Sequence, residues 1–248
     1  MKSVVADSLA KFVKVTGHIR EHWSPGKQWC NPWFRGHEEA TWLLRPSAYR
    51  YARPNEDELR LEFKLRAVTL LDGARPSTDW GWYFLMQHYG LPTRLLDWTD
   101  SSILALFFAV RTKRNRSRAA VWALDPWALN ENAIGKGELL LESDAAAAPY
   151  LPPAAPSSTT PLPRPPIAVQ PAHGSTRMFV QRSRFTIHGA RRAGFRAMLE
   201  GGSLIRILIP GTALKAIRND LRTAGVFETT VFPDLDGLCR EIKDVWVR

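Results

Sequence analysis

The chain has 248 residues, of which 45% are hydrophobic and 23% charged, and this is an ordinary globular composition. Extensive disorder is therefore excluded, and we expect residues 1–248 to form one domain rather than two small ones. No uncharged apolar run approaches the roughly 18 residues that span a bilayer, and residues 1–20 carry no secretory apolar block. We expect a cytoplasmic protein without a membrane partner.

Charge and cysteine content indicate the kind of partner. Lys and Arg number 34 against 24 Asp and Glu, and a formal charge of +10 attracts nucleic acid or a phosphorylated small molecule. Part of the excess of positive charge lies in residues 111–118. An alternative interpretation gives these cations a structural role, in which they interact with the negative end of the preceding helix and keep a loop soluble. Cys30 and Cys239 lie far apart without a CxxC spacing, so neither a metal site nor a disulfide framework is predicted.

Hydrophobic periodicity predicts the elements of the first half of the chain. A strand is expected to end at Trp33 and Phe34 and to break into a turn at Arg35 and Gly36. Thr99, Asp100 or Ser101 is expected to cap a central, wholly apolar helix. The predicted helices cover residues 1–22, 55–71, 79–89 and 102–110, the segment 91–99 is extended, and 119–124 is a strand.

The second half of the chain contains a biased segment between regular elements. Residues 145–174 are rich in Pro and Ala, and we interpret them as a flexible insertion. The remaining predicted strands are 177–181, 185–188, 204–209 and 227–232, and the predicted helices are 212–224 and 236–243. Strands separated by helices indicate an α+β (mixed α/β) fold, with a mixed, largely antiparallel sheet flanked by helices.

Three groups of residues are candidates for chemistry. Arg35 beside Gly36 can present a rigid guanidinium fork to a phosphate, although an arginine paired with a carboxylate for structural reasons remains open. The polar residues of 87–99 interrupt a core-like sequence and form a natural ligand cradle between two helices. The third group combines Gln181 with the late carboxylates Glu228 and Asp234, of which the last can equally cap a helix.

These groups together resemble the FRG domain in order and spacing. The motifs that carry the resemblance are W-F-R-G-H at 33–37, L-x-P-x-x-x-R at 44–50, Q-H-Y-G-L-P-T-R-L-L-D-W-T at 87–99, A-L-F-F-A at 105–109, Gln181 with F-T at 185–186, and F-P-D-L-D-G-L at 232–238. The resemblance spans about residues 25–245, the Pro-rich insertion excepted. FRG domains occur in mobile elements and conflict systems, so the resemblance implies a toxin or defence effector.

The resemblance extends to ADP-ribosyltransferases, which implies a split sheet and NAD as substrate, without a metal. Their site begins with an arginine on an early strand, continues with a hydroxyl and ends with a late carboxylate, and Arg35, Thr93 and Glu228 or Asp234 occur in that order. A carboxylate would stabilise the oxocarbenium-like state that forms when the nicotinamide bond breaks. The expected catalytic residues are Glu228 and Asp234, and the expected NAD-binding residues are Arg35, Gly36, His88, Tyr89, Thr93, Arg94, Asp97 and Gln181.

Two other functions remain open at this point. A non-catalytic nucleic-acid or nucleotide-binding module would use Arg35, Arg94 and the 111–118 cations as phosphate contacts. A protein-interaction domain in a toxin–antitoxin or defence assembly would use the Pro-rich segment as a tether. A nuclease is disfavoured because the aspartates lack the Lys or His spacing that would accompany a metal centre.

Overall fold

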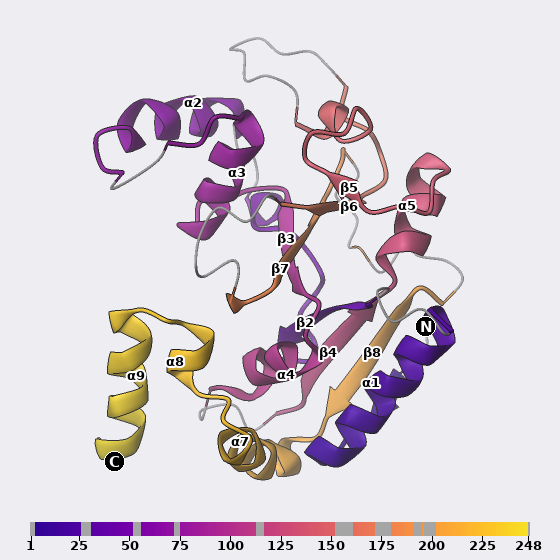
Figure 1. The fold of residues 1–248 in the computed structure, drawn as a ribbon, viewed down its shortest axis with the longest axis vertical. Coiled ribbons are helices and arrows are strands. Elements are labelled where there is room, and N and C mark those ends of the chain that lie inside the picture. The colour runs from indigo at the N-terminus through magenta and orange to yellow at the C-terminus, as the bar shows by residue number, and fades with distance from the viewer. Residues whose placement is uncertain are drawn as a thin grey trace.

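The computed structural model describes residues 3–25, 31–51, 56–71, 75–112, 117–151, 161–171, 180–190, 195 and 202–247 (Figure 1). The strands are β1 (Ser3–Val5), β2 (Trp33–His37), β3 (Leu95–Thr99), β4 (Ala119–Leu124), β5 (Leu140–Leu141), β6 (Ile167–Gln170), β7 (Ser183–Ile187) and β8 (Leu204–Ile209). The helices are α1 (Leu9–Trp23), α2 (Glu56–Ala67), α3 (Asp79–His88), α4 (Ser102–Val110), α5 (Pro126–Ile134), α7 (Leu214–Thr223), α8 (Glu228–Val231) and α9 (Leu235–Trp246), with 3-10 turns at Ser47–Arg50, Ala148–Tyr150 and Gly211–Ala213.

The strands form one mixed sheet in the order β1-β8-β4-β2-β3-β7-β6-β5. Only β1 with β8 and β5 with β6 run parallel among these pairs, so the predicted α+β class with a largely antiparallel sheet is confirmed. Helices α1, α4 and α7 bury one face of the β8-β4-β2 part, and α3 packs on the β3-β7-β6 part. A tryptophan-rich cluster that includes Trp33, Trp98 and Trp122 forms the third core cluster.

The two central strands of the sheet, β2 and β3, share fewer paired residues than any other neighbouring strands described. Strand β2 pairs with β4 at five positions, whereas β2 pairs with β3 only where Phe34 faces Thr99. Beyond that pair the β2–β3 ladder does not continue, so Gly36 and Asp97, which this register would place opposite each other, are not paired. The two four-stranded halves therefore meet at a single residue pair, and side chains rather than backbone must bridge the gap beside it.

Gly36 lies within β2 rather than in a turn, so the predicted turn after Phe34 is wrong. The antiparallel partner β4 continues the ladder through Arg35 and His37, which holds this segment extended. A Cβ on Gly36 would lie 2.1 Å from the Ala105 carbonyl oxygen and 2.7 Å from the Ala109 backbone nitrogen of α4. The glycine is required here because the apolar helix α4 packs directly on the backbone of β2.

The N-terminal and C-terminal elements correct two predictions. The predicted helix 1–22 begins only at Leu9, capped by the Ser8 hydroxyl, because residues 3–5 pair with β8 as a strand. The predicted strand 227–232 is a single helical turn, α8, in which the Thr230 hydroxyl accepts from the Phe227 backbone N–H at 2.8 Å. The β-branched run from Thr229 to Val231 favoured a strand, but the Thr230 hydroxyl, which also donates to the Phe227 carbonyl oxygen, favours the turn.

The predicted flexible insertion is wrong for the part that the structure describes. Ile167, Ala168 and Val169 are fully buried in β6, between β5 and β7, and Tyr150 and Leu151 also belong to the core. Helix α5 was not predicted, and it begins directly after Asp125 because that carboxylate accepts hydrogen bonds from the backbone N–H groups of Trp127 and Ala128. Residues 152–160 and 172–179, and with them most of the predicted strand 177–181, lie outside the described residues.

Replacing Gly36 by alanine is expected to destabilise the protein by about 3 kcal/mol or more, because the new methyl group meets backbone atoms that cannot move alone. Gly17 is the matched control, since it lies exposed in α1 with nothing near its Cβ position. Gly17→Ala is expected to stabilise by about 0.5–1 kcal/mol. Urea unfolding followed by circular dichroism measures both, and equal stabilities for the two variants would contradict the packing role of Gly36.

Candidate functional site

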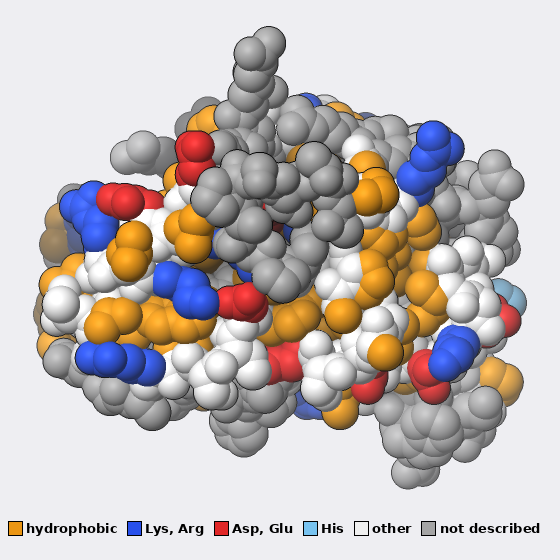
Figure 2. Space-filling model, turned by 90° about the horizontal axis from the view of Figure 1, so that it is seen from above, with side chains coloured by type: hydrophobic (Ala, Val, Ile, Leu, Met, Phe, Trp, Pro, Cys, Tyr) orange, Lys and Arg blue, Asp and Glu red, His pale blue; other side chains and the backbone are white. Residues whose placement is uncertain are grey.

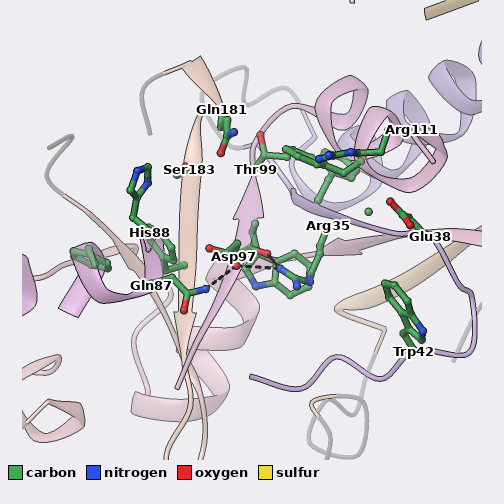
Figure 3. Close-up of a pocket in the computed structure, with 16 residues that line it drawn as sticks. Arg35, Glu38, Trp42, Gln87, His88, Asp97, Thr99, Arg111, Gln181 and Ser183 are labelled. Carbon is green, nitrogen blue, oxygen red and sulfur yellow. Dashed lines mark hydrogen bonds and ion pairs between the residues drawn. The ribbon is translucent and has the colours of Figure 1, made fainter. Parts of the chain in front are cut away.

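A cleft of about 430 Å³ opens where β2 and β3 separate (Figure 3). Its charged lining consists of the cations Arg35 and Arg111 and the carboxylates Glu38 and Asp97. The remaining lining is polar or aromatic, namely Phe34, Gly36, Trp42, Phe84, Gln87, His88, Trp98, Thr99, Phe108, Gln181, Ser183 and Phe185. The cleft thus joins both halves of the sheet with α3, α4 and the segment that follows β2.

Arg35 bridges the gap between the separated strands. Its Nη1 donates to the Asp97 carbonyl oxygen at 2.6 Å and lies 3.5 Å from the Asp97 carboxylate. Burial lowers the pKa of Arg35, and the Asp97 charge opposes that shift, so the guanidinium stays cationic. The side chain is still 21% exposed, and its Nη2 has no acceptor among the described residues, so part of the fork faces the cleft.

His37 fixes the other edge of the Arg35 guanidinium. It is buried on β2, two residues from Arg35, and its Nε2 lies 3.1 Å from the Arg35 Nε. Burial, reinforced by the Arg35 charge, lowers the pKa of His37 to about 3, so the ring is neutral. A neutral imidazole has one acceptor nitrogen, and the Trp122 Nε1 at 3.3 Å from Nδ1 is the more distant donor. We therefore assign Nε2 as the acceptor of the Arg35 N–H.

Asp97 is held from both sides of the cleft. Gln87 on α3 donates from Nε2 to Asp97 Oδ2 at 2.8 Å, and the side-chain Oε1 of Gln87 accepts a hydrogen bond from the Thr93 hydroxyl. The Asp97 side chain is nevertheless 53% exposed, so one carboxylate edge faces solvent in the cleft. Thr93 itself is fully buried behind Gln87 and does not line the cleft, which makes it a support for Gln87.

Four more of the predicted site residues have clear positions. Gly36, His88 and Gln181 line the cleft, and the Gln181 amide also donates to the Val231 carbonyl at 3.2 Å. Tyr89 follows the end of α3, is mostly exposed, and does not belong to the cleft lining. The structure therefore brings Arg35, Gly36, Gln87, His88, Asp97 and Gln181 together and leaves Tyr89 outside.

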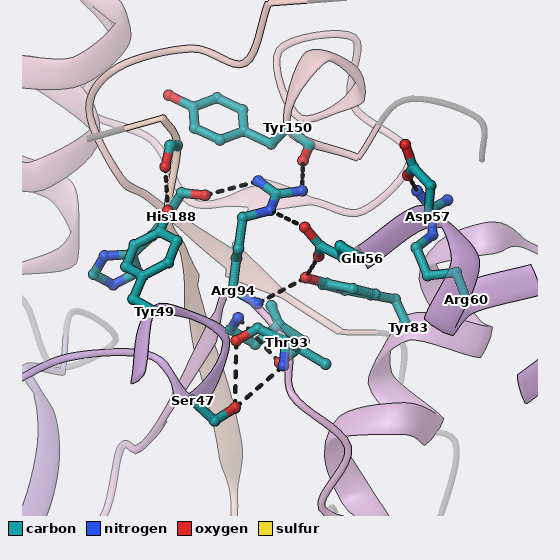
Figure 4. A network of polar contacts seen from close by, with 12 residues as sticks. Ser47, Tyr49, Glu56, Asp57, Arg60, Tyr83, Thr93, Arg94, Tyr150 and His188 are labelled. Carbon is teal, nitrogen blue, oxygen red and sulfur yellow. Dashed lines mark hydrogen bonds and ion pairs between the residues drawn. The ribbon is translucent and has the colours of Figure 1, made fainter. Parts of the chain in front are cut away.

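Arg94 lies in a buried polar network instead of the cleft (Figure 4). Its Nε donates to Glu56 at 2.6 Å, its Nη1 to the His188 carbonyl at 2.7 Å, and its Nη2 to the Tyr150 carbonyl at 2.6 Å. The Tyr83 hydroxyl accepts from the Arg94 backbone N–H and donates to Glu56. All three guanidinium nitrogens are thus satisfied by protein, and the network ties α2, α3 and β7 to the start of β3.

The late carboxylates do not face Arg35 across the cleft. Glu228 belongs to α8, where it pairs with Arg240 at 3.1 Å and Arg111 at 3.7 Å, and it borders a second, smaller cavity. Asp234 caps α9 by accepting from the Gly237 backbone at 2.7 Å. Neither carboxylate lines the main cleft, because the predicted strand that was to carry Glu228 is a helical turn.

Glu38 and Trp42 line the cleft without having been predicted as site residues, and Arg111 lines it as well. Glu38 follows β2 directly and accepts a hydrogen bond from the Thr112 hydroxyl. Arg111 was predicted only as one of the 111–118 cations that would contact phosphates in a binding module, and its guanidinium lies 5.0 Å from the centre of the Phe232 ring. Their position after β2 and after the capped helix α4 was the available signal, since loops that follow central elements carry site residues.

The described residues contain neither a cluster of three or more His, Cys, Asp or Glu that could hold a metal ion, nor a helix that is both long and apolar enough to cross a membrane.

Residues 31–118 match the family described as FRG domain. The matched segment contains β2, α3, β3 and α4, and hence most of the cleft, but it ends before Gln181 and the late carboxylates. The chain matches no curated protein and no solved structure. The predicted resemblance is therefore confirmed over the first part of its expected span.

Replacing Arg94 by methionine is expected to destabilise the protein by about 3–5 kcal/mol, because Glu56 loses its cationic partner and two buried carbonyls lose their donor. Arg66 is the matched control, since it is 78% exposed on α2 and, among the described residues, its only ion pair is with Glu62. Arg66→Met is expected to change the free energy of unfolding by about 0.5 kcal/mol or less. Urea unfolding measures both, and a small effect at Arg94 would contradict its structural role.

Two buried histidines make stability depend on pH. Burial lowers the pKa of His37 and of His188 from 6.5 to about 3, with Arg94 reinforcing the shift at His188. Because both folded pKa values lie below the unfolded value, this stabilisation is complete above pH 6.5 and is lost as the pH falls toward 3. We expect each histidine to reduce stability by about 2 kcal/mol between pH 6.5 and 5.

The measurement is urea unfolding of the protein and of His188→Gln at pH 7, 6 and 5. The free energy of unfolding of His188→Gln is expected to fall between pH 7 and 5 by about half as much as that of the unaltered protein, since one of the two titrating groups is gone. An identical pH dependence in both proteins would show that His188 does not carry the shift.

Proposed function

From the premise that this chain carries an FRG domain over residues 31–118, we propose that it binds NAD in the Arg35 cleft and transfers ADP-ribose to a macromolecular acceptor. The observation that carries the proposal is the fixed Arg35 fork beside the held carboxylate of Asp97. A cation that is already anchored on His37 and on the Asp97 carbonyl loses little freedom when it binds phosphate. Nucleic acid is the proposed acceptor.

The two cleft cations are suited to the diphosphate of NAD. Arg35 offers its free Nη2, and Arg111 lines the cleft from the end of α4. Guanidinium groups bind phosphate oxygens through paired hydrogen bonds, and each such charged contact contributes about 1.5–3 kcal/mol. His88 and Trp42 provide ring surfaces in the same cleft for the planar ends of the dinucleotide.

Asp97 takes the catalytic role that was first expected of Glu228 and Asp234. In the proposed reaction the bond between nicotinamide and the ribose C1′ breaks, and nicotinamide leaves with the electron pair. The acceptor nucleophile then forms a bond to C1′ and gives its proton to water or to a cleft carboxylate. The Asp97 carboxylate would stabilise the oxocarbenium-like ribose, and its contacts with Gln87 and Arg35 hold it in position.

The remaining parts of the proposal concern the cell. A net charge of +10 favours a polyanionic acceptor. On the face seen in Figure 2, however, basic and acidic side chains are interspersed among hydrophobic ones, so the excess is not a uniform coat. We place the activity in the cytoplasm, where NAD and nucleic acid meet, as that of a toxin or defence effector held by an antitoxin or defence partner.

A non-catalytic nucleotide-binding module is the second candidate. The observation that favours it is that both predicted late carboxylates have structural contacts outside the cleft, while Asp97 is partly neutralised by Arg35. Such a module would bind NAD or a related nucleotide without consuming it. The bound nucleotide would then stay chemically unchanged with the unaltered protein and with an Asp97 variant alike.

Replacing Arg35 by alanine is expected to weaken NAD binding about 10- to 100-fold, because one charged phosphate contact is lost. Isothermal titration with NAD measures the affinity, and Arg66→Ala, on the exposed face of α2, controls for loss of charge. Unchanged affinity in Arg35→Ala would contradict the proposed site.

The same preparations separate enzyme from binding module. Consumption of labelled NAD with mixed protein and nucleic-acid acceptors is expected to fall about 100-fold in Asp97→Asn, a loss typical of removing one electrostatic group. Glu228→Gln and Asp234→Asn are expected to stay within about twofold of the unaltered protein, and asparagine caps a helix as well as aspartate does. Binding of NAD by folded protein without any consumption would favour the second candidate.

A further inference from the structure

A second groove, of about 530 Å³, adjoins the cleft and shares Trp42 with it. It is lined by the segment after β2, by β4 and β8, and by Ser117 and Arg118 just before β4. Trp42 and Leu43 stand 52% and 60% exposed at its edge, which is unusual for adjacent large apolar side chains. The groove therefore has an exposed indole surface at its edge.

Two arginines in this groove lack a carboxylate partner within the described part of the chain. Arg118 is exposed and forms no ion pair there. Arg206 lies over the Trp122 ring at 5.7 Å and reaches only the Ser3 hydroxyl at 3.4 Å, and its Nε is buried without an acceptor. Glu39, the carboxylate in the lining, accepts a hydrogen bond from Ser117. The groove thus offers two cations to an anionic ligand.

The groove and the cleft are connected by a row of residues across the sheet. Arg35 on β2 faces Trp122 on β4, and Trp122 faces Arg206 on β8. Because neighbouring strands lie about 4.8 Å apart, the backbones of the two arginines are separated by about 10 Å. A flexible chain of phosphates can therefore contact Arg206 and Arg118 while its end reaches the mouth of the cleft at Trp42.

We propose that this groove binds single-stranded nucleic acid. An exposed indole stacks on a base only when that base is unpaired, and arginines beside it hold the phosphates, so the combination matches a single strand better than a duplex. An acidic peptide would satisfy the cations but not the ring surface. The groove's role as the acceptor site rests on the proposed function, whereas its binding of nucleic acid does not.

The test is fluorescence anisotropy of a labelled 20-nucleotide oligothymidylate at increasing salt. The double variant Arg118→Gln/Arg206→Gln is expected to bind about tenfold more weakly at low salt, and its salt slope is expected to fall by about 1.4 because two phosphate contacts are removed. The double variant Arg66→Gln/Lys136→Gln removes the same charge outside the groove and is expected to bind like the unaltered protein. Equal binding by both double variants would overturn the proposal.

Because Arg206 is partly buried on β8, its replacement can also disturb folding, so a second variant reverses only the charge of the exposed Arg118. Arg118→Glu is expected to bind the oligonucleotide about tenfold more weakly or worse. Polyglutamate of equal charge is expected to compete poorly, and equal competition would identify an acidic-peptide site and overturn the proposal. So would the absence of any oligonucleotide binding by the unaltered protein.

Titration with NAD in the same variants separates this inference from the proposed function. The groove variants are expected to keep their NAD affinity, and Arg35→Ala is expected to keep its oligonucleotide affinity. Oligonucleotide binding that depends on Arg118 in a protein without NAD affinity would retain the groove and reject the proposed function. NAD binding without oligonucleotide binding would reject the groove alone.

Discussion

The hydrogen bond from Arg35 to the Asp97 main-chain carbonyl is the interaction on which the site depends. Strands β2 and β3 share one residue pair, and beyond it the guanidinium takes the place of the missing ladder bond. Two supports hold it there, since His37 accepts from its Nε and the Asp97 carboxylate lies beside its Nη1. The opening between the sheet halves is therefore both a cleft and a region with a positioned cation.

The polar residues around this opening separate into two sets with different physical roles. Arg35, Gln87 and Asp97 are joined to one another and keep exposed edges in the cleft. Arg94 and Thr93 are buried, and their side chains form hydrogen bonds with other protein groups. Arg94 thereby fixes the start of β3, and Thr93 fixes the orientation of Gln87. The contiguous polar motif 87–99 is thus divided into a cleft-facing part, which contains Gln87 on α3 and Asp97 on β3, and a buried supporting part that precedes β3.

The predictions succeeded where local patterns and tertiary structure agree. The strands 119–124 and 204–209 and the helix 102–110 have the predicted bounds, because each is an apolar run with a clear start and stop. They failed where a distant partner decides: Ser3–Val5 is a strand only because β8 lies beside it, and Ile167–Gln170 is a core strand despite its Pro-rich surroundings. The packing of Gly36 against Ala105 and Ala109 of α4 is likewise a contact between segments distant in the sequence, which no local pattern contains.

The sequence by itself determined the α+β class, the FRG resemblance that the match over 31–118 bears out, and the candidacy of Arg35, Gly36, His88, Asp97 and Gln181, all of which line the cleft. Motif order and hydrophobic period carry that information, because both are properties of neighbouring residues. Only the tertiary structure decided that Glu228 and Asp234 lie elsewhere and that Glu38, Trp42 and Arg111 line the cleft. The physical reason is that a cleft is enclosed by elements distant in sequence, and one helical turn in place of a strand moves a carboxylate out of it.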